Sequence, residues 1–176
     1  MMAAARRSRL RLPRDVGELV GLERGERALA WACDAEGRWY VGSDRALHLP
    51  SDEAGYRRLP WEQVERADWQ RDDRRLSIVE VAEWGEPERR TVVGIDEAGE
   101  LLELLRERVT KSVVVSVYAP VRGRLGLSVV GRRSPAGAGL ITWSTVLAAG
   151  LAPDEPDVRE VAGSALRKAE AEVAGL

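Results

Sequence analysis

The sequence of 176 residues contains no phenylalanine, one histidine and one cysteine. Tryptophan, present six times, must therefore supply most of the large apolar surface that a core needs. The single cysteine, Cys33, cannot form an internal disulfide, so nothing indicates an oxidising compartment. His48 and Cys33 together fall short of the three or four close ligands that zinc takes, and we predict no metal site and no cofactor.

The sequence also lacks a long apolar run. None approaches the roughly 18 residues that a membrane span requires, and no apolar segment of the secretory type follows the N-terminus. Lysine occurs only at Lys111 and Lys168, so the basic residues are nearly all arginines, while the net charge is −2. This balance predicts no general attraction to nucleic acid or anionic membranes. We expect a cytoplasmic protein without a transmembrane segment.

Residues 1–14 form the one strongly basic stretch. They contain Arg6, Arg7, Arg9, Arg11 and Arg14, and no acidic residue comes before Asp15. We predict a disordered tail, and an arm that binds nucleic acid or acidic lipid is the alternative.

Short apolar segments separated by turn residues follow between Ala28 and Ile95. About six of them read as strands, because they are rich in β-branched and aromatic residues and are joined by short polar connections. Pro50 is expected to end the third segment, since proline lacks the amide that a ladder needs. This spacing predicts an antiparallel barrel or sandwich. The expected strands lie within 28–33, 39–41, 45–49, 64–69, 76–82 and 91–95.

The apolar period then changes to that of a helix. Leucines and a valine at helical spacing predict an amphipathic helix over 97–110, with Asp96 as its N-cap. A shorter helix is expected over 15–22, with Asp15 in a capping box. After 110, alternating residues predict a hairpin that turns at Arg122-Gly123, a further strand near 141–145, and a last helix that opens within 153–156.

Strands followed directly by an amphipathic helix have the order of a pleckstrin-homology-like (PH-like) barrel capped by its helix. The segments SDRALHLP (43–50) and LPWEQVERADW (59–69) resemble bacterial PH-like domains. Together with LLELLRERVTKSVV (101–114), they also look like a family of uncharacterised actinobacterial proteins. Such domains are commonly taken as interaction or assembly modules, so the resemblance implies no catalytic chemistry.

No residue pattern gives an enzyme signature. His48 alternates with Leu47 and Leu49, and we interpret it as a solvent-facing or edge residue rather than a catalytic base. Cys33 lies in an apolar segment, which favours a buried thiol over a nucleophile. GRLGLSVVG (123–131) lacks the lysine of a phosphate-binding loop and the spacing of a dinucleotide-binding loop.

Arginine pairs and one tryptophan remain as candidate partner-binding residues. The pairs sit near expected turns and strand ends, where several would meet at one rim and hold phosphate groups or an acidic partner. The alternative is a dispersed surface neutralised by Asp and Glu. A tryptophan in an expected hairpin either anchors a partner or covers an end of the barrel. The candidates are Trp84, Arg57, Arg58, Arg74, Arg75, Arg89 and Arg90.

We therefore predict an α+β fold with a mainly antiparallel PH-like barrel or sandwich over 15–110, capped by the amphipathic helix. Residues 111–176 form a β-hairpin and helix extension packed on the same domain. The predicted function is a non-enzymatic cytoplasmic interaction or assembly module that binds a protein partner, or itself, through a sheet edge or the Trp84 hairpin. The alternative function is anion binding, with nucleic acid or acidic lipid held by the arginine-rich rim and the N-terminal arm.

Overall fold

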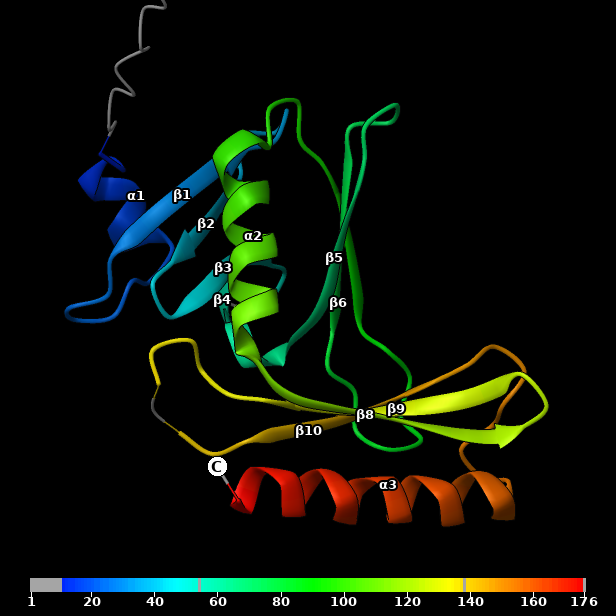
Figure 1. Cartoon of the computed structure of the whole chain (residues 1–176). Coiled ribbons are helices and arrows are strands. Elements are labelled where there is room, and N and C mark those ends of the chain that lie inside the picture. Colours follow the sequence, from blue (N-terminus) through cyan, green and yellow to red (C-terminus); the bar gives the residue numbers. More distant parts are fainter. Residues whose placement is uncertain (1–10, 54, 138, 176) are drawn as a thin grey trace, which may run out of the picture.

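The computed structural model describes residues 11–53, 55–137 and 139–175. The predicted basic tail lies mostly outside these residues. In the described part the chain alternates antiparallel strands with three α-helices, which confirms the α+β class (Figure 1). The elements are α1 (Arg14–Leu19), β1 (Ala28–Cys33), β2 (Trp39–Ser43), β3 (Ala46–Ser51), β4 (Gly55–Pro60), the 3₁₀ turn η1 (Trp61–Gln63), β5 (Val64–Gln70), β6 (Arg75–Glu80), β7 (Arg90–Gly94), α2 (Gly99–Ser112), β8 (Val113–Arg122), β9 (Leu125–Arg132), β10 (Thr142–Leu147) and α3 (Pro156–Ala174).

Strands β1 to β7 form two antiparallel sheets, in the orders β1-β2-β3-β4 and β5-β6-β7. The chain passes from one sheet to the other through η1. There Trp61 is fully buried, and its indole N–H donates to the Ser43 carbonyl at 3.0 Å. Among the described residues no ladder joins the two sheets, so of the two predicted arrangements, barrel or sandwich, the structure fits a sandwich.

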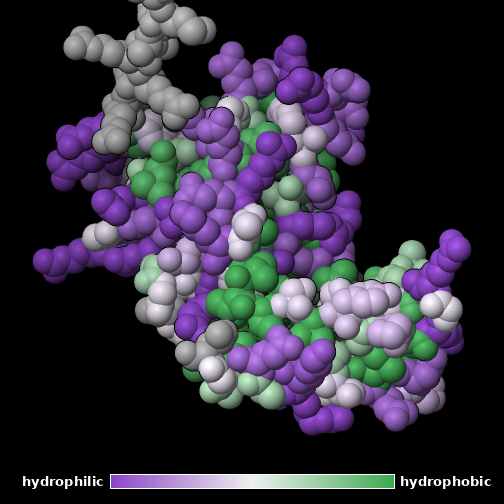
Figure 2. Space-filling view, in the orientation of Figure 1, coloured by the Kyte–Doolittle hydropathy of each residue, from purple (hydrophilic) through white to green (hydrophobic). Residues whose placement is uncertain are grey.

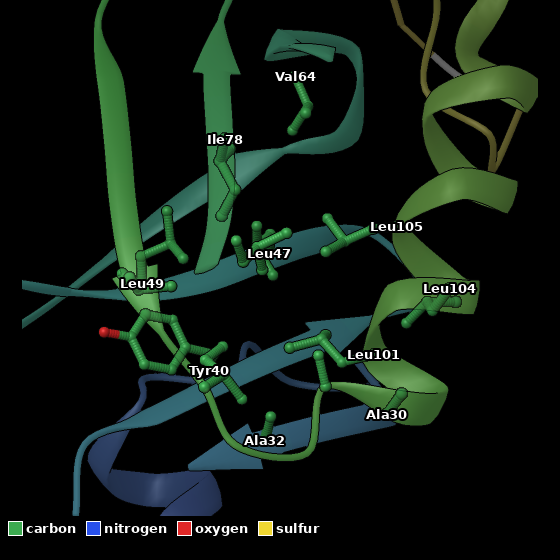
Figure 3. Packing of buried hydrophobic residues seen from close by; sticks show 14 of the residues in the cluster. Ala30, Ala32, Tyr40, Leu47, Leu49, Val64, Ile78, Leu101, Leu104 and Leu105 are labelled. Carbon is green, nitrogen blue, oxygen red and sulfur yellow. The ribbon is translucent and has the colours of Figure 1, made fainter. Parts of the chain in front are cut away.

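Helix α2 covers one open side of this sandwich and completes its core (Figure 1). Its buried leucines Leu101, Leu104 and Leu105 point toward residues of β1, β2 and β3 (Figure 3). Gly42 permits this contact, because a Cβ at position 42 would lie only 2.6 Å from Leu104 Cδ2. The apolar period that predicted this helix therefore identified its buried face correctly.

The N-terminal segment packs on the other face of the first sheet. Val16 and Val20 are buried against Val41 of β2, and they form a small apolar cluster separate from the main core. Both faces of the first sheet are thus covered, which explains why the first four residues of β3 are all buried.

Strands β8, β9 and β10 form a third antiparallel sheet in the order β10-β9-β8, and α3 lies along one of its faces (Figure 1). Val158, Ala162, Ala165 and Ala169 of α3 pack on Val117, Leu127 and Val129. Small residues on the helix allow this close contact. The predicted hairpin at Arg122-Gly123 and the predicted last helix are both confirmed.

One buried arginine connects the third sheet to the sandwich. Arg132 of β9 donates to the Glu65 carbonyl at 2.8 Å, to Ser112 Oγ at 3.0 Å and to the Val109 carbonyl at 3.3 Å. Its guanidinium therefore ties β9 to the end of α2 and the start of β5. Burial lowers the pKa of Arg132 below its ordinary value.

Several boundaries differ from the sequence predictions. Strand β3 continues through Pro50 to Ser51, and β4, which the sequence did not predict, pairs with it. Proline is tolerated there because a hairpin end needs fewer ladder amides than the middle of a strand. The two predicted caps are also wrong: α1 begins after Pro13 and α2 after Ala98, and neither has a side-chain cap. Asp96 instead pairs with Arg74.

Candidate functional site

The single histidine lies in a buried polar cluster, not at the surface as the sequence had suggested. The His48 side chain is fully buried beneath the N-terminal segment. Its Nδ1 lies 2.9 Å from the Val20 carbonyl, and its Nε2 lies 3.2 Å from Glu26 Oε1. Both ring nitrogens therefore face oxygen atoms, one on the N-terminal segment and one on Glu26.

Glu26 is the centre of this cluster. Its carboxylate accepts hydrogen bonds from the Glu23 amide, the Ser43 hydroxyl and the His48 ring. Burial by itself would raise the pKa of Glu26, but the hydrogen bonds from Ser43, Glu23 and His48 outweigh it and hold the pKa below the ordinary 4.5.

The same cluster does not have the geometry of a nucleophile and its base. The Ser43 hydroxyl has two acceptors within hydrogen-bond reach, Glu26 Oε1 and the Ala46 carbonyl, and among the described contacts it makes none to His48. Ser43 and His48 are both fully buried, so a substrate does not reach them. The cluster instead fastens the N-terminal segment to β2 and β3.

Cys33 ends β1 in an exposed position, which corrects the expectation of a buried thiol. Partial burial, and then the nearby charge of Asp34, raise the pKa of Cys33 and disfavour the nucleophilic thiolate.

The candidate arginines separate into different places. Arg57, Arg89 and Arg90 come together with Arg38 around a pocket of about 390 Å³ between the end of β3, β4 and β7. Arg58 points to the other face of β4, where it lies 3.6 Å from Glu26 Oε2. Arg74 and Arg75 stand at the distant turn between β5 and β6.

Carboxylates already bind the arginines of the first pocket. Arg57 makes two hydrogen bonds to Glu80, at 2.6 and 3.1 Å, and Arg89 lies 3.6 Å from the same side chain. Arg38 pairs with Asp34 and Glu36, and Arg90 with Glu88. Much of the positive charge that the sequence suggested for a rim is therefore neutralised within the molecule.

Trp84 lies in the turn between β6 and β7, where the Glu86 amide donates to the Glu83 carbonyl at 3.0 Å. Its side chain is 44 % exposed. Trp84 is thus outside the buried core, and enough of its ring is exposed to contact a partner.

A second pocket, which the sequence did not predict, has a volume of about 550 Å³. It lies between the β5–β6 turn, which carries Arg71 and Arg74, and the first two turns of α2, which carry Leu102 and Arg106. Trp69 of β5 forms part of its wall. Only the folded chain brings these residues together, since they are separated by up to 37 positions in the sequence.

The third sheet presents a surface of another kind. Tyr118 of β8 is 62 % exposed on the face opposite α3, and Val113 of the same strand is 37 % exposed. Figure 2 shows hydrophobic and weakly polar colours gathered over this lower part of the molecule, whereas hydrophilic residues dominate the upper part. The alternation of β8 was predicted from the sequence, but not which of its faces α3 would leave open.

Among residues 11–53, 55–137 and 139–175, no three His, Cys, Asp or Glu side chains gather into a group that could hold a metal ion. No helix in this part of the chain is long and apolar enough to cross a membrane. Comparisons with protein-family models, with curated proteins and with solved structures find no match to this chain.

Proposed function

We propose that the protein is a non-enzymatic interaction module that binds an extended segment of a protein partner along the outer edge of β8. One observation carries this proposal. β8 is ten residues long, ends its sheet, and has no charged residue from Val113 to Val121. A free strand edge of this kind pairs readily with another strand, because its amides and carbonyls lack partners on one side.

The end strands of the other sheets are protected. β4 carries Arg57 and Arg58, and β5 and β7 also contain charged residues. β1 has no charge, but α2 packs against it. Charges and covering elements are the usual means by which proteins prevent strand addition. α3 packs on one face of β8 as α2 packs on β1, but β8 is longer, with ten residues against six, and it carries no charge from Val113 to Val121. Between two register shifts its ladder to β9 is regular from Val115 to Pro120, and this stretch is the edge that we propose takes a partner.

Tyr118 supplies an anchor beside this edge. Its ring lies over Gly126 of β9, so closely that a Cβ at position 126 would collide with it. A tyrosine held in this way loses little conformational freedom when a partner binds, and tyrosine is common among residues that dominate binding energy. Serine and proline neighbours at Ser116 and Pro120 leave the ring accessible.

The sandwich and its helix have a supporting role in this proposal. A four-stranded sheet, a three-stranded sheet and a helix, in that order, are consistent with a PH-like unit over 15–110. In this view 111–176 is an extension whose sheet is fixed to that unit by Arg132 and presents β8 to a cytoplasmic partner.

Co-purification with edge variants tests the proposal. The tagged protein is recovered from a nuclease-treated lysate of its source organism and washed at low and high salt. We expect one stoichiometric partner that survives high salt and is lost from Ser116→Lys, which places a charge on the exposed face of β8. Hydrogen exchange should show new protection of β8 amides when the purified partner is added.

Val92→Lys is the matched control, because it places the same charge on another exposed end strand, β7. Retention of the partner by this variant together with its loss from Ser116→Lys and Tyr118→Ala supports the β8 edge. The opposite pattern, or loss only from Trp84→Ala, assigns binding to the β6–β7 side and refutes the proposed edge.

Anion binding is a second candidate, favoured by the gathering of Arg38, Arg57, Arg89 and Arg90 around one pocket. Nucleic acid or acidic lipid held there would dissociate steeply as salt rises, since such binding is dominated by exposed charges. Retention on heparin or on anionic vesicles at about 50 mM salt, lost in Arg89→Gln/Arg90→Gln, would support this function. Anion binding is the weaker candidate, because Glu80 already neutralises the charge of Arg57 and lies close to Arg89.

A further inference from the structure

We propose that the second pocket, between the β5–β6 turn and α2, binds a nucleoside phosphate. This site is separate from the proposed partner edge, and it shares no lining residue with the first arginine pocket. Its volume of about 550 Å³ is in the range of pockets that hold small organic ligands.

The first argument is the charge of the lining residues. Arg71, Arg74 and Arg106 approach the pocket from two elements, and the planar guanidinium group matches phosphate oxygens two at a time. Among the described residues, neither Arg71 nor Arg106 has a carboxylate within 4.0 Å. The arginines of the first pocket, by contrast, form ion pairs with Asp and Glu side chains.

The second argument is the backbone at Arg74. With φ of 50° it is the one residue other than glycine, in the described part of the chain, that takes a positive φ. Glycine or asparagine adopts this conformation at lower cost, and the turn could contain either without loss of a buried contact, since the Arg74 side chain is 66 % exposed. Strained residues of this kind occur mostly where the side chain has a function.

The third argument is the apolar wall. Trp69 of β5 and Leu102 of α2 both pack partly on the core, and both line the pocket. A nucleobase stacks on such an indole face, and this contact needs no particular base. α2 also begins beside this pocket, and the positive N-terminal end of its dipole favours a negatively charged ligand, as the arginines do.

Two carboxylates in the lining of the pocket would repel an anion. Asp96 and Glu97 line the pocket, and Asp96 Oδ1 lies 3.0 Å from Arg74 Nη1. This ion pair is exposed and therefore weak, so a phosphate can displace it. Replacing Asp96 by asparagine should then strengthen binding, because it removes a like charge and frees Arg74.

Titration calorimetry and indole N–H spectra of the full chain test the site with AMP, UMP, adenosine and inorganic phosphate as probes. We expect AMP and UMP to saturate the site below about 1 mM and to shift the indole signal that is lost in Trp69→Phe. Adenosine should bind at least tenfold more weakly, because it lacks the phosphate. The proposal is overturned if neither nucleotide binds, or if inorganic phosphate binds as tightly as AMP.

Variants locate the binding. Arg71→Gln and Arg106→Gln should each weaken AMP binding roughly tenfold, the loss of one charge-assisted contact, and Asp96→Asn should strengthen it. Arg124→Gln is the matched control, since this exposed arginine of the β8–β9 turn lines neither pocket. Equal effects of Arg71→Gln and Arg124→Gln would show nonspecific attraction and overturn the site.

Arg74→Asn tests the strain directly. Asparagine accepts a positive φ, so the thermal midpoint should stay the same or rise while AMP binding weakens. A lower midpoint with unchanged binding would show that Arg74 serves stability instead, and would contradict the proposal.

Discussion

Replacing Glu26 by alanine tests how the N-terminal segment is fixed to the sandwich. The Glu26 side chain is fully buried, and its removal takes the acceptor from three donors. Ser43 can keep a partner, because its hydroxyl also reaches the Ala46 carbonyl at 3.0 Å. The amide of Glu23 lies at the half-exposed rim and can bind water.

His48 has no such alternative, because its ring is fully buried. An unsatisfied buried donor costs about 1–3 kcal/mol. We therefore expect Glu26→Ala to lower the free energy of unfolding by about 1–3 kcal/mol, which is a substantial part of the total stability of a domain of this size.

Urea denaturation at neutral pH measures this loss, and hydrogen exchange should show faster exchange first in residues 12–27. Glu23→Ala is the control. Its side chain is 55 % exposed and lies 3.6 and 3.8 Å from Arg58 and Arg45, so its removal should cost less than about 1 kcal/mol. A loss below about 1 kcal/mol for Glu26→Ala would refute the reasoning.

The pKa of Glu26 gives the same prediction a pH dependence. A carboxyl whose pKa is lowered on folding stabilises the protein fully above its unfolded value of 4.5, and the contribution is lost as the pH falls through the folded value. The stability difference between the wild type and Glu26→Gln should therefore shrink as the pH falls below 4.5.

Three further predictions concern the packing and the turns. Gly42→Ala should cost about 1–3 kcal/mol in urea denaturation, because its Cβ would collide with Leu104 of α2; no cost would mean that α2 does not approach β2 so closely. Arg132→Met should cost about 2–4 kcal/mol, since it leaves buried carbonyls without donors, and an unchanged midpoint would contradict the role of this arginine as a link between the sheets. Asp34 accepts hydrogen bonds from Glu36, Arg38 and Tyr40, and although burial alone would raise the pKa of Asp34, these bonds lower it below 3.8. Asp34→Asn should therefore lose less stability than the wild type on acidification below this pH, as measured by thermal midpoints, and parallel pH profiles would argue against it.

The sequence predicted those elements whose signal is local. The hairpin at Arg122-Gly123 and the last helix follow from local pattern, and the structure confirms them. The alternation predicted after residue 110 is interrupted in β8 by a register shift between Val113 and Val115. The predictions of the caps failed because α1 begins after Pro13 and α2 after Ala98, and neither of these residues has a side chain that can accept a hydrogen bond from the first turn.

His48 failed for a different reason. Its alternation with Leu47 and Leu49 correctly placed it on the face away from the main core. Whether that face is covered depends on the N-terminal segment, whose Val20 carbonyl approaches the ring from 28 positions away. No local period contains this information, and the same holds for the pocket around Trp69, which needs both the β5–β6 turn and α2.

The two proposed binding sites, the β8 edge and the second pocket, differ in their charge. Arg57, Arg66 and Arg122 each lie against carboxylates of other elements, so these charges act within the molecule and attract polyanions weakly. Arg71 and Arg106 stand apart from this pattern beside an aromatic wall. From Val113 to Val121 the edge of β8 has no charge to be screened. Salt should therefore separate the two activities in one preparation: binding at the pocket should weaken as salt rises, whereas strand addition at β8 should persist. Partner binding as salt-sensitive as nucleotide binding would mean that the partner is held by arginines and not by the strand edge.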